Sequence, residues 1–489
     1  MNRNFLRFDT CKVAVLFILL ALAVAAIAQT SLGTIAGVVT DPQGAVIQNA
    51  TVTAVSNATG EKHTTTTNAL GAYRIESVGP GAYTITVKAD KFSDLKMEGA
   101  VVTASVTTTV NAVLKVGVAE TTVTVETTGQ QLQTEDGAIT HNISNVEITS
   151  IPISSLNPIA LVLTEPGVVQ PSGRESFTNG IGFSVNGTRP RANNFLIEGF
   201  DNNDAAIQGQ ALQVDNLEAT KEVSILTNSY NAEFGHGGGS VTNLIYKSGT
   251  NAWHGSVYDL LQNSTLDANN ASNKINGSPK SKFRENTYGF TIGGPVKHDK
   301  IFVFGSIQWD KQREGTSGST LTVPTDSGFA TLQGIAAGNP RVTNYLAALG
   351  SLHASSTGQG LTNILLSNGQ NVQVARVQRL GIAEPSNDTQ YVAKGDWQLT
   401  QSDSNTIRYT YDLSNLTPDF FNFPNLLPCC DTQQGGAAHN GGLSYTHAFS
   451  PRLSMSSALR MAESALPLGP PPLPQPTPWP MGLLSPFPA

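Results

Sequence analysis

Cysteine is scarce in this chain, which contains three cysteines among 489 residues. Cys11 lies before the first apolar run, so it is not placed as the lipid-carrying cysteine of a lipoprotein. The other two, Cys429 and Cys430, are adjacent in the sequence. A disulfide framework is therefore excluded, whereas a strained bridge between the neighbours and two free thiols both remain open.

Long apolar runs and basic charge are also lacking. After residue 28 there is no run of about 18 or more apolar residues, which excludes a membrane-spanning helix there. The net charge is −7, and loss of residues 1–28 would make it about −9, because three positive charges and one negative charge would go. Nucleic acids bind concentrated basic surfaces, so no nucleic-acid partner is expected.

Signatures of enzymes, cofactors and metal sites are missing as well. The stretch His236–Gly239 looks like the oxyanion loop of lipases, but no G-x-S-x-G nucleophile elbow accompanies it. Asp201–Asp204 gathers oxygen ligands without the spacing of a calcium loop. No zinc-ligand pair, P-loop or dinucleotide fingerprint occurs. We expect no enzyme activity, no cofactor and no metal, and we interpret Asp201–Asp204 as a surface turn.

What the chain does contain begins with an export signal. Three basic residues precede the unbroken apolar run Val13–Ala26, which is short for a spanning helix. Small residues at Ala26 and Ala28 predict cleavage before Gln29. Residues 1–28 are therefore predicted to be a secretory signal peptide, with a retained N-terminal anchor as the alternative.

Residues 29–116 read as short strands separated by turn signals, in a chain whose Thr, Asn, Gly and Val content suits an all-β exported protein. Such even spacing indicates a small β-sandwich. The stretches GTIAGVVTDPQGAVIQNATVTAV and GAYRIESVGPGAYTITVKADKF resemble the carboxypeptidase regulatory-like domain. The resemblance implies a transthyretin-like β-sandwich and no peptidase activity.

Residues 117–127 form a linker rich in threonine and valine. Within it, one hexapeptide resembles a TonB box, an extended segment that adds a strand to an energising partner. Its residues are Glu120, Thr121, Thr122, Val123, Thr124 and Val125. The alternatives are one more sandwich strand or a plain linker.

Residues 128–246, with FSVNGTRPRANNFLIEGFDNND and NSYNAEFGHGGGSVTNLIYKSGTNAWHG as the most specific pieces, resemble the plug domain (α+β) of TonB-dependent outer-membrane transporters and its junction with the barrel. The order of motifs from Gly33 to Pro324 is similar to the Oar-like subgroup. One departure is Ile151–Asn157, which lacks an arginine usual in the family. The matching positions are Asn186, Gly187, Arg189, Glu198, Gly199, Asp201, Glu233, Gly235, Gly238, Gly239, Lys247, Ser248, Gly249, His254 and Gly255.

Residues 247–460 show the alternation of apolar and polar residues that transmembrane β-strands require. Two such stretches, 391–399 and 407–413, lie on either side of the spacer Gln401–Ser404, which predicts a hairpin with a short periplasmic turn. About seven strands are expected in all, and Gly315–Asp388 reads mainly as a long extracellular loop.

Transporters of this kind close with about 22 strands, and an open sheet leaves costly unpaired backbone groups in lipid. Residues 461–489 are proline-rich, which forbids sheet pairing. These observations favour an incomplete outer-membrane β-barrel whose last segment, after truncation or a frameshift, is not family sequence; a genuine proline-rich tail is the alternative.

The resemblance implies an outer-membrane receptor that imports an unidentified small molecule, glycan or peptide. Its partners would be membrane lipid and a periplasmic TonB-type protein, which supplies the force. Two alternatives from other classes remain: a non-functional fragment of such a transporter, and a surface protein for adhesion or carbohydrate binding.

Overall fold

The computed structural model describes residues 32–117, 123–126, 137–153, 156–171, 180–205, 208–230, 234–235, 237–269, 271–275, 280, 282–316, 320–350, 352–355, 359–378, 382–400, 402–416, 434–450 and 453–465. The predicted signal peptide with Ala26, Ala28 and Gln29, the candidate residues Glu120–Thr122, and Glu233 lie outside these ranges. So do Cys429, Cys430 and residues 466–489. Strands dominate the described chain, as the composition predicts.

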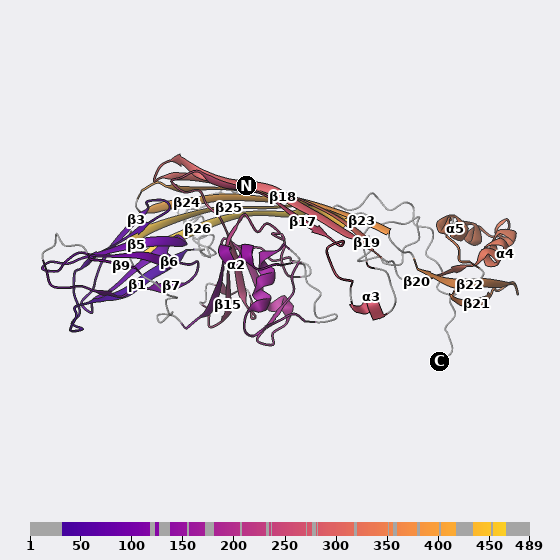
Figure 1. Ribbon diagram of the computed structural model, residues 1–489, viewed down its shortest axis with the longest axis horizontal. Coiled ribbons are helices and arrows are strands. Elements are labelled where there is room, and N and C mark those ends of the chain that lie inside the picture. The colour runs from indigo at the N-terminus through magenta and orange to yellow at the C-terminus, as the bar shows by residue number, and fades with distance from the viewer. Residues whose placement is uncertain are drawn as a thin grey trace, which may run out of the picture.

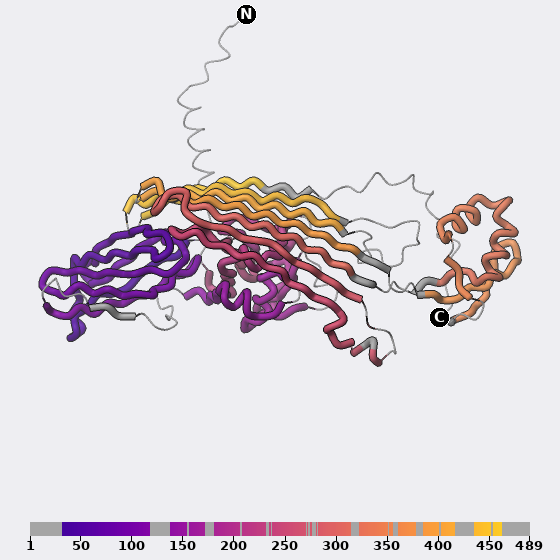
Figure 2. The backbone as a smooth tube through the Cα atoms, turned by 45° about the horizontal axis from the view of Figure 1, so that its top comes forward, coloured from indigo at the N-terminus to yellow at the C-terminus, as the bar shows by residue number. Residues whose placement is uncertain are grey.

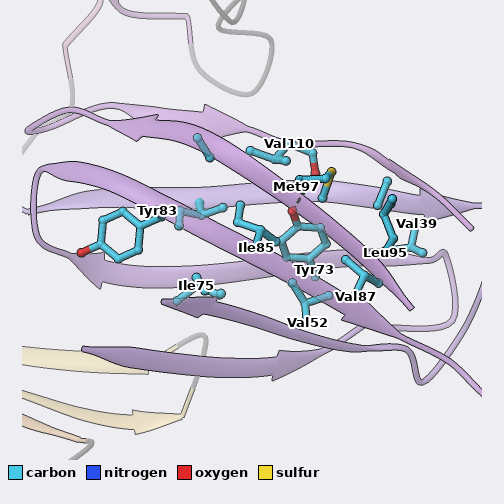
Figure 3. Close-up of a cluster of buried hydrophobic side chains, with 14 of the residues drawn as sticks. Val39, Val52, Tyr73, Ile75, Tyr83, Ile85, Val87, Leu95, Met97 and Val110 are labelled. Carbon is cyan, nitrogen blue, oxygen red and sulfur yellow. Dashed lines mark hydrogen bonds between the residues drawn. The ribbon is translucent and has the colours of Figure 1, made fainter. Parts of the chain in front are cut away.

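Residues 32–117 form an N-terminal domain of two β-sheets. One sheet joins β1 (Gly33–Thr40), β4 (Ala72–Val78), β7 (Thr107–Thr109) and β8 (Ala112–Val113). The other has the order β3 (Lys62–Thr66), β2 (Thr51–Ser56), β5 (Gly81–Lys88), β6 (Leu95–Val102) and β9 (Val123–Glu126). Figure 3 shows the shared apolar core, in which the Tyr73 hydroxyl donates to the Val110 carbonyl oxygen at 2.6 Å.

The linker segment that contains the TonB-box candidate contributes a strand to this domain. Residues Val123–Glu126 form β9, which pairs in parallel with Leu95–Glu98 of β6. The described part of the candidate is thus an additional strand of the second sheet. An additional sandwich strand was one of the alternatives to the TonB box that the sequence left open.

Residues 137–246 form a central domain with a five-stranded mixed sheet, a two-stranded sheet and short helices. Its strands are β10 (Ile139–Ser144), β11 (Val168–Val169), β12 (Ser184–Val185), β13 (Asn194–Ile197), β14 (Phe200–Asp201), β15 (Thr220–Asn228) and β16 (Val241–Tyr246), with helices α2 (Asn145–Ser150), η2 (Pro158–Thr164) and η4 (Pro190–Ala192). The main sheet has the order β10-β15-β16-β13-β14. Helix α2 begins with a capping box between Ser144 and Glu147, which pairs backbone N–H groups that would otherwise lack acceptors.

Seven long strands form one curved sheet, which arches over the central domain (Figures 1 and 2). They are β17 (His254–Asn263), β18 (Phe283–Lys297), β19 (Ile301–Thr316), β23 (Ile382–Gln398), β24 (Asp403–Leu416), β25 (Gln434–Ser450) and β26 (Leu453–Ala465), each antiparallel to the next. The predicted hairpin is confirmed, since Gln398 pairs with Ser404 and Asn405 with Trp397. Strand β26 continues past the expected boundary at residue 460.

The expectation of a long loop over Gly315–Asp388 is wrong. Strands β19 and β23 extend into this range, and a small unit stands between them at the end of the sheet far from the N-terminal domain (Figure 1). It contains β20 (Thr320–Pro324), α4 (Asp326–Ala336), α5 (Pro340–Leu349), β21 (Gln359–Leu365) and β22 (Asn371–Gln378). Its two helices pack on the sheet β20-β22-β21 and bury apolar side chains between them, among which are Val323, Leu332 and Val374.

Helix α3 (Ala271–Ile275) lies in the connection between β17 and β18. Among the described residues, no helix is both long and apolar enough to cross a membrane.

The N-terminal domain has a core of its own, which leads to a stability prediction. Ile85 is fully buried in that core, so Ile85→Ala should lower the free energy of unfolding of a 29–117 fragment by roughly 2–5 kcal/mol. Thr86→Ala, on the opposite face of the same strand, serves as the control. Urea unfolding followed by circular dichroism measures both; equal losses would contradict a core between the two sheets.

Candidate functional site

The two faces of the seven-stranded sheet differ in chemistry. The face toward the central domain carries buried polar side chains: Thr287, Thr291, Ser306, Gln308, Gln390, Arg408, Thr410 and Asn440. The opposite face exposes apolar ones: Val257, Leu261, Phe290, Ile292, Ile407, Leu413, Leu443, Met455 and Leu459. Polar-in and apolar-out alternation is what a sheet between lipid and an aqueous lumen requires.

Aromatic side chains lie on this apolar face in two groups. Near the middle of the strands, the rings of Tyr288 and Trp309 stack with their centroids 5.6 Å apart, and one row nearer the short turns those of Tyr391 and Tyr411 lie 5.7 Å apart. Toward the short turns, His447 and Phe449 are in edge contact. Paired aromatic belts are typical of the two membrane–water interfaces.

The central domain contacts the inner face through hydrogen bonds and through apolar packing, in which Phe304 and Val392 of the sheet join the core of the domain. Gln390 Nε2 donates to the Gln213 carbonyl oxygen at 3.0 Å, and Gln308 Nε2 donates to that of Asp215 at 2.6 Å. Further contacts join Asn216 with Ser306, Tyr246 with Thr410, Asn202 with Asn440, and Glu218 with Ser256. Polar contacts therefore join the two parts at several separate places.

A buried ion pair stands at the centre of this contact. Glu198 and Gly199 form the two-residue turn between β13 and β14, with φ of 52° and 79°. Both values are positive, as a type I′ hairpin requires, which accounts for a glycine at position 199. The turn presents Glu198 to Lys394 on β23, where the carboxylate and ammonium lie 2.5 Å apart with side chains 3% and 8% exposed.

Next to this pair, β14 is held by a second set of groups. Asp201 forms an ion pair with Arg460 of β26. The Arg408 guanidinium lies over the Phe200 ring, 4.9 Å from its centroid. A side chain at Gly442 would collide with that ring, because an added Cβ would lie 2.8 Å from it. Sequence reasoning singled out Glu198 and Asp201 but not their cationic partners, which are distant in the chain.

Farther along the inner face, the charged neighbours of a carboxylate are other carboxylates rather than basic side chains. Asp215 of the central domain faces Asp412, with Asp310 and Glu285 beyond. Desolvation, followed by the negative charge of Asp412, raises the pKa of Asp215 to about 7. Among the described residues, no cluster of three or more acidic, histidine or cysteine side chains has the arrangement of a metal site.

The remaining predicted positions fall into two places rather than one pocket. Asn186 and Gly187, both with positive φ, form the turn after β12, and Asn186 Nδ2 donates to the Thr227 carbonyl oxygen. Gly239 packs tightly, since an added Cβ would lie 2.5 Å from Asn193 Oδ1. Gly235, Gly238 and Arg189 are exposed. The segment Asp201–Asp204, expected as a surface turn, is half-buried or buried and internally hydrogen-bonded.

The second place is the passage from β16 to β17. Lys247 pairs with Glu218 at 3.4 Å, and Ser248 follows at the end of the strand. Gly249 and Gly255 allow close backbone approach, because an added Cβ would lie 2.5 Å and 2.3 Å from carbonyl oxygens of Val303 and Thr291. His254 is exposed and lies beside the Ala252 carbonyl oxygen at 3.0 Å.

The N-terminal domain meets both other parts near the short turns. Glu222 Oε1 accepts a hydrogen bond from the Ala104 N–H at 2.9 Å, and Asn251 N–H donates to the Ala58 carbonyl oxygen at 2.9 Å. Burial raises the pKa of Glu222 although the Ala104 N–H opposes the shift. A cavity of about 480 Å³ remains where the three parts meet, lined among others by Tyr83, Lys221, Glu198, Lys394 and Asp396.

The buried ion pair leads to one prediction. Glu198→Gln should lower the free energy of unfolding by about 3 kcal/mol or more, because Lys394 would be left buried without its counter-charge. Glu98→Gln breaks the exposed pair with Lys96 and should cost under about 1 kcal/mol. Urea unfolding in detergent compares the two. Adding Lys394→Met to Glu198→Gln should recover part of the loss, and no recovery would show that the charge pair is not the cause.

The raised pKa of Asp215 leads to a second prediction, on the pH dependence of stability. Because its folded-state pKa of about 7 lies above the ordinary value of 3.8, the native state binds the proton more tightly. The unfolding free energy should therefore fall as pH rises from about 4 to 7. Asp215→Asn should flatten this fall and be more stable than the parent at pH 8 by about 1–3 kcal/mol. Thermal unfolding across pH, with exposed Asp90→Asn as the control, tests the sign.

Comparison with known proteins agrees with this architecture. A family model described as an outer membrane beta barrel domain matches residues 245–472, and one described as a carboxypeptidase regulatory-like domain matches residues 34–115. The barrel match thus extends into the segment expected to be unrelated. The TonB-dependent transporter Oar of Myxococcus xanthus is 28% identical over 304 residues, which cover 58% of this chain and 27% of that protein.

Solved structures show weaker likeness. The outer membrane transporter YddB from Escherichia coli is 13% identical with a TM-score of 0.39, covering 63% of this chain and 36% of that one. A mutant of the ferric enterobactin receptor PfeA from Pseudomonas aeruginosa is 12% identical with a TM-score of 0.41, covering 66% and 40%. The chain spans about a quarter of the length of the Oar transporter. In its two domain matches and in this relative, the chain is similar to the TonB-dependent transporters of the outer membrane, with a carboxypeptidase regulatory-like domain in its N-terminal part.

Proposed function

We propose that the chain is part of a transporter for energised uptake across the outer membrane and that the central domain is its plug. The observation that carries the proposal is the polar contact between the central domain and the inner face of the sheet. Direct hydrogen bonds such as Asn216–Ser306 and Tyr246–Thr410 can be exchanged for bonds to water at little enthalpic cost. A domain that shifts inside an aqueous lumen is helped by contacts of this kind, and the apolar part of the contact, where Phe304 and Val392 meet its core, is the part that would resist hydration.

Force would enter from the periplasmic side. The short turns between the long strands and the N-terminal domain lie at the same end of the sheet (Figure 1), and short turns are periplasmic in bacterial barrels. The described part of the candidate box, Val123–Val125, lies on the N-terminal domain at that end. A TonB-type partner would bind it by strand addition, either beside β9 or in place of the pairing between β9 and β6.

The substrate class follows only from relatives. The similar solved proteins include ferric enterobactin and siderophore receptors, and the substrate of this chain is proposed as a small molecule, glycan or peptide. In this mechanism the chain performs no covalent chemistry, because the free energy for import comes from the partner. The activity is proposed for the whole transporter, of which the chain spans a part.

Movement of the plug can be tested without a known substrate. Ser224 of β15 is fully buried, and its hydroxyl has no hydrogen-bond partner among the residues that the structure describes, so Ser224→Cys should fold normally. In cells producing the Cys429→Ser/Cys430→Ser background, a membrane-impermeant thiol reagent should label position 224 several-fold faster when the TonB-type system is energised. An uncoupler should remove the difference, because the plug then stays packed.

Two controls accompany this measurement. Ala54→Cys, buried in the N-terminal domain, should stay protected in both states. Val123→Pro should abolish the energised labelling at position 224 while Val123→Ala preserves it, since proline removes a backbone donor needed for strand addition. Labelling that ignores energisation would refute the proposed plug, and equal effects of the two Val123 variants would refute strand addition alone.

A further inference from the structure

Basic side chains gather on the outer face of β18 and β19, beyond one aromatic belt. Arg284, Lys311 and Arg313 are all exposed and all point away from the central domain, since they alternate with the inward residues Glu285 and Gln312. We name these three residues the outer basic cluster. Tyr288 and Trp309 lie next to it along the same strands, and apolar Phe290 and Ile292 follow.

The cluster lies at the extracellular end of the strands. Three connections leave the sheet there, spanning 264–282, 317–381 and 417–433, whereas the opposite end has the tight turns 298–300 and 399–402. Long connections face the outside in outer-membrane barrels and short ones face the periplasm. The belt of Tyr288 and Trp309 marks the membrane–water interface. The basic cluster is therefore at the level of the headgroups of the outer leaflet.

Register makes the cluster electrostatically unfavourable when nothing is bound. Arg284 and Arg313 are directly opposite each other in the antiparallel pair, and Lys311 is two residues from Arg313 on the same face. Like charges in directly opposed positions destabilise a sheet. Among the described residues, none of the three forms an ion pair with a carboxylate; Asp259, one row nearer the middle of the same face, pairs with none of them.

Neighbouring groups hold the cluster in a fixed geometry. The Arg313 guanidinium donates to the Ser386 carbonyl oxygen at 3.2 Å and to Asn387 Oδ1 at 3.0 Å. The Lys311 ammonium lies over the Tyr288 ring, 5.7 Å from its centroid. Ordering these long side chains in advance lowers the entropy cost of capturing an anion. Guanidinium groups also match the geometry of phosphate oxygens.

We propose that the outer basic cluster binds the phosphate groups of an anionic glycolipid in the outer leaflet, while its acyl chains lie along the apolar face below Tyr288. Charge complementarity favours this occupant over a zwitterionic phospholipid, whose headgroup brings its own cation. Each basic residue near an anionic lipid surface changes affinity about fivefold. The proposal rests on the location of the sheet in the outer membrane and not on transport.

The test uses the full chain in nonionic detergent and fluorescent lipid A that carries both phosphates. Lys311→Gln/Arg313→Gln should weaken binding roughly thirtyfold. Lys297→Gln/Lys300→Gln is the matched control, because it removes two exposed charges from the other end of the same hairpin. Its affinity should change less than about twofold. Lipid A without phosphates should bind the parent and the Lys311/Arg313 variant equally weakly, and millimolar inorganic phosphate should not displace the intact lipid.

Arg313 also contacts β23, so its replacement can disturb folding. The pair Arg284→Gln/Lys311→Gln leaves Arg313 in place and should weaken binding to a similar extent, with an unchanged thermal midpoint. The proposal is overturned if this pair binds lipid A as tightly as the parent, or if the hairpin control loses as much affinity as the cluster variants. It is also overturned if removal of the phosphates leaves affinity unchanged, or if free phosphate competes fully, which would make the cluster a site for the soluble anion.

Discussion

The contact between the central domain and the polar inner face of the long strands is the constraint on which the other features depend. Backbone groups in lipid must be paired within the protein, and polar side chains must face water or other polar groups. Among the described residues, the five inner strands of the sheet meet the first need by pairing on both sides, whereas β17 and β26 pair on one side. The strands turn Gln308, Gln390 and Asn440 inward. The central domain meets the second need with its own amides, hydroxyls and carboxylates, so its surface is matched to the sheet rather than to solvent.

The electrostatic interaction across this contact changes from attraction to repulsion along the strands. Near the short turns, Glu198 and Asp201 meet Lys394 and Arg460, and the attraction is strong because both members of the first pair are buried. Toward the other end, Asp215 meets further carboxylates, and the charges repel. Charge attraction thus holds the domain at the side nearer the N-terminal domain, whereas at the other side hydrogen bonds such as that from Gln308 to the Asp215 carbonyl oxygen hold it against charge repulsion. A change of protonation would act mainly on the side where the charges repel.

The sequence was a good guide wherever a local pattern decided the structure. Alternation over 391–399 and 407–413 predicted β23, β24 and the turn between them, and the Glu198-Gly199 turn lay among the expected positions. It could not reveal that Glu198 meets Lys394, 196 residues away, because strand register sets that contact. The unit after β19 was missed although helix signals were present: Thr325 caps α4, and Asn339 with Pro340 begins α5. The abundance of Gly, Ser and Asn obscured them.

That unit, residues 320–378, also bears on how such a chain can diversify. Its entry and exit are already brought together, because Thr316 of β19 pairs with Ile382 of β23. Because the pairing of β19 with β23 already holds the two ends together, a longer insertion adds little to the entropy cost of closing the connection. Among the described residues, the clusters that bury Val323, Leu332 and Val374 consist of side chains of this unit alone. Evolution can thus exchange it as a module, altering what the outer surface presents while the strands below keep their register.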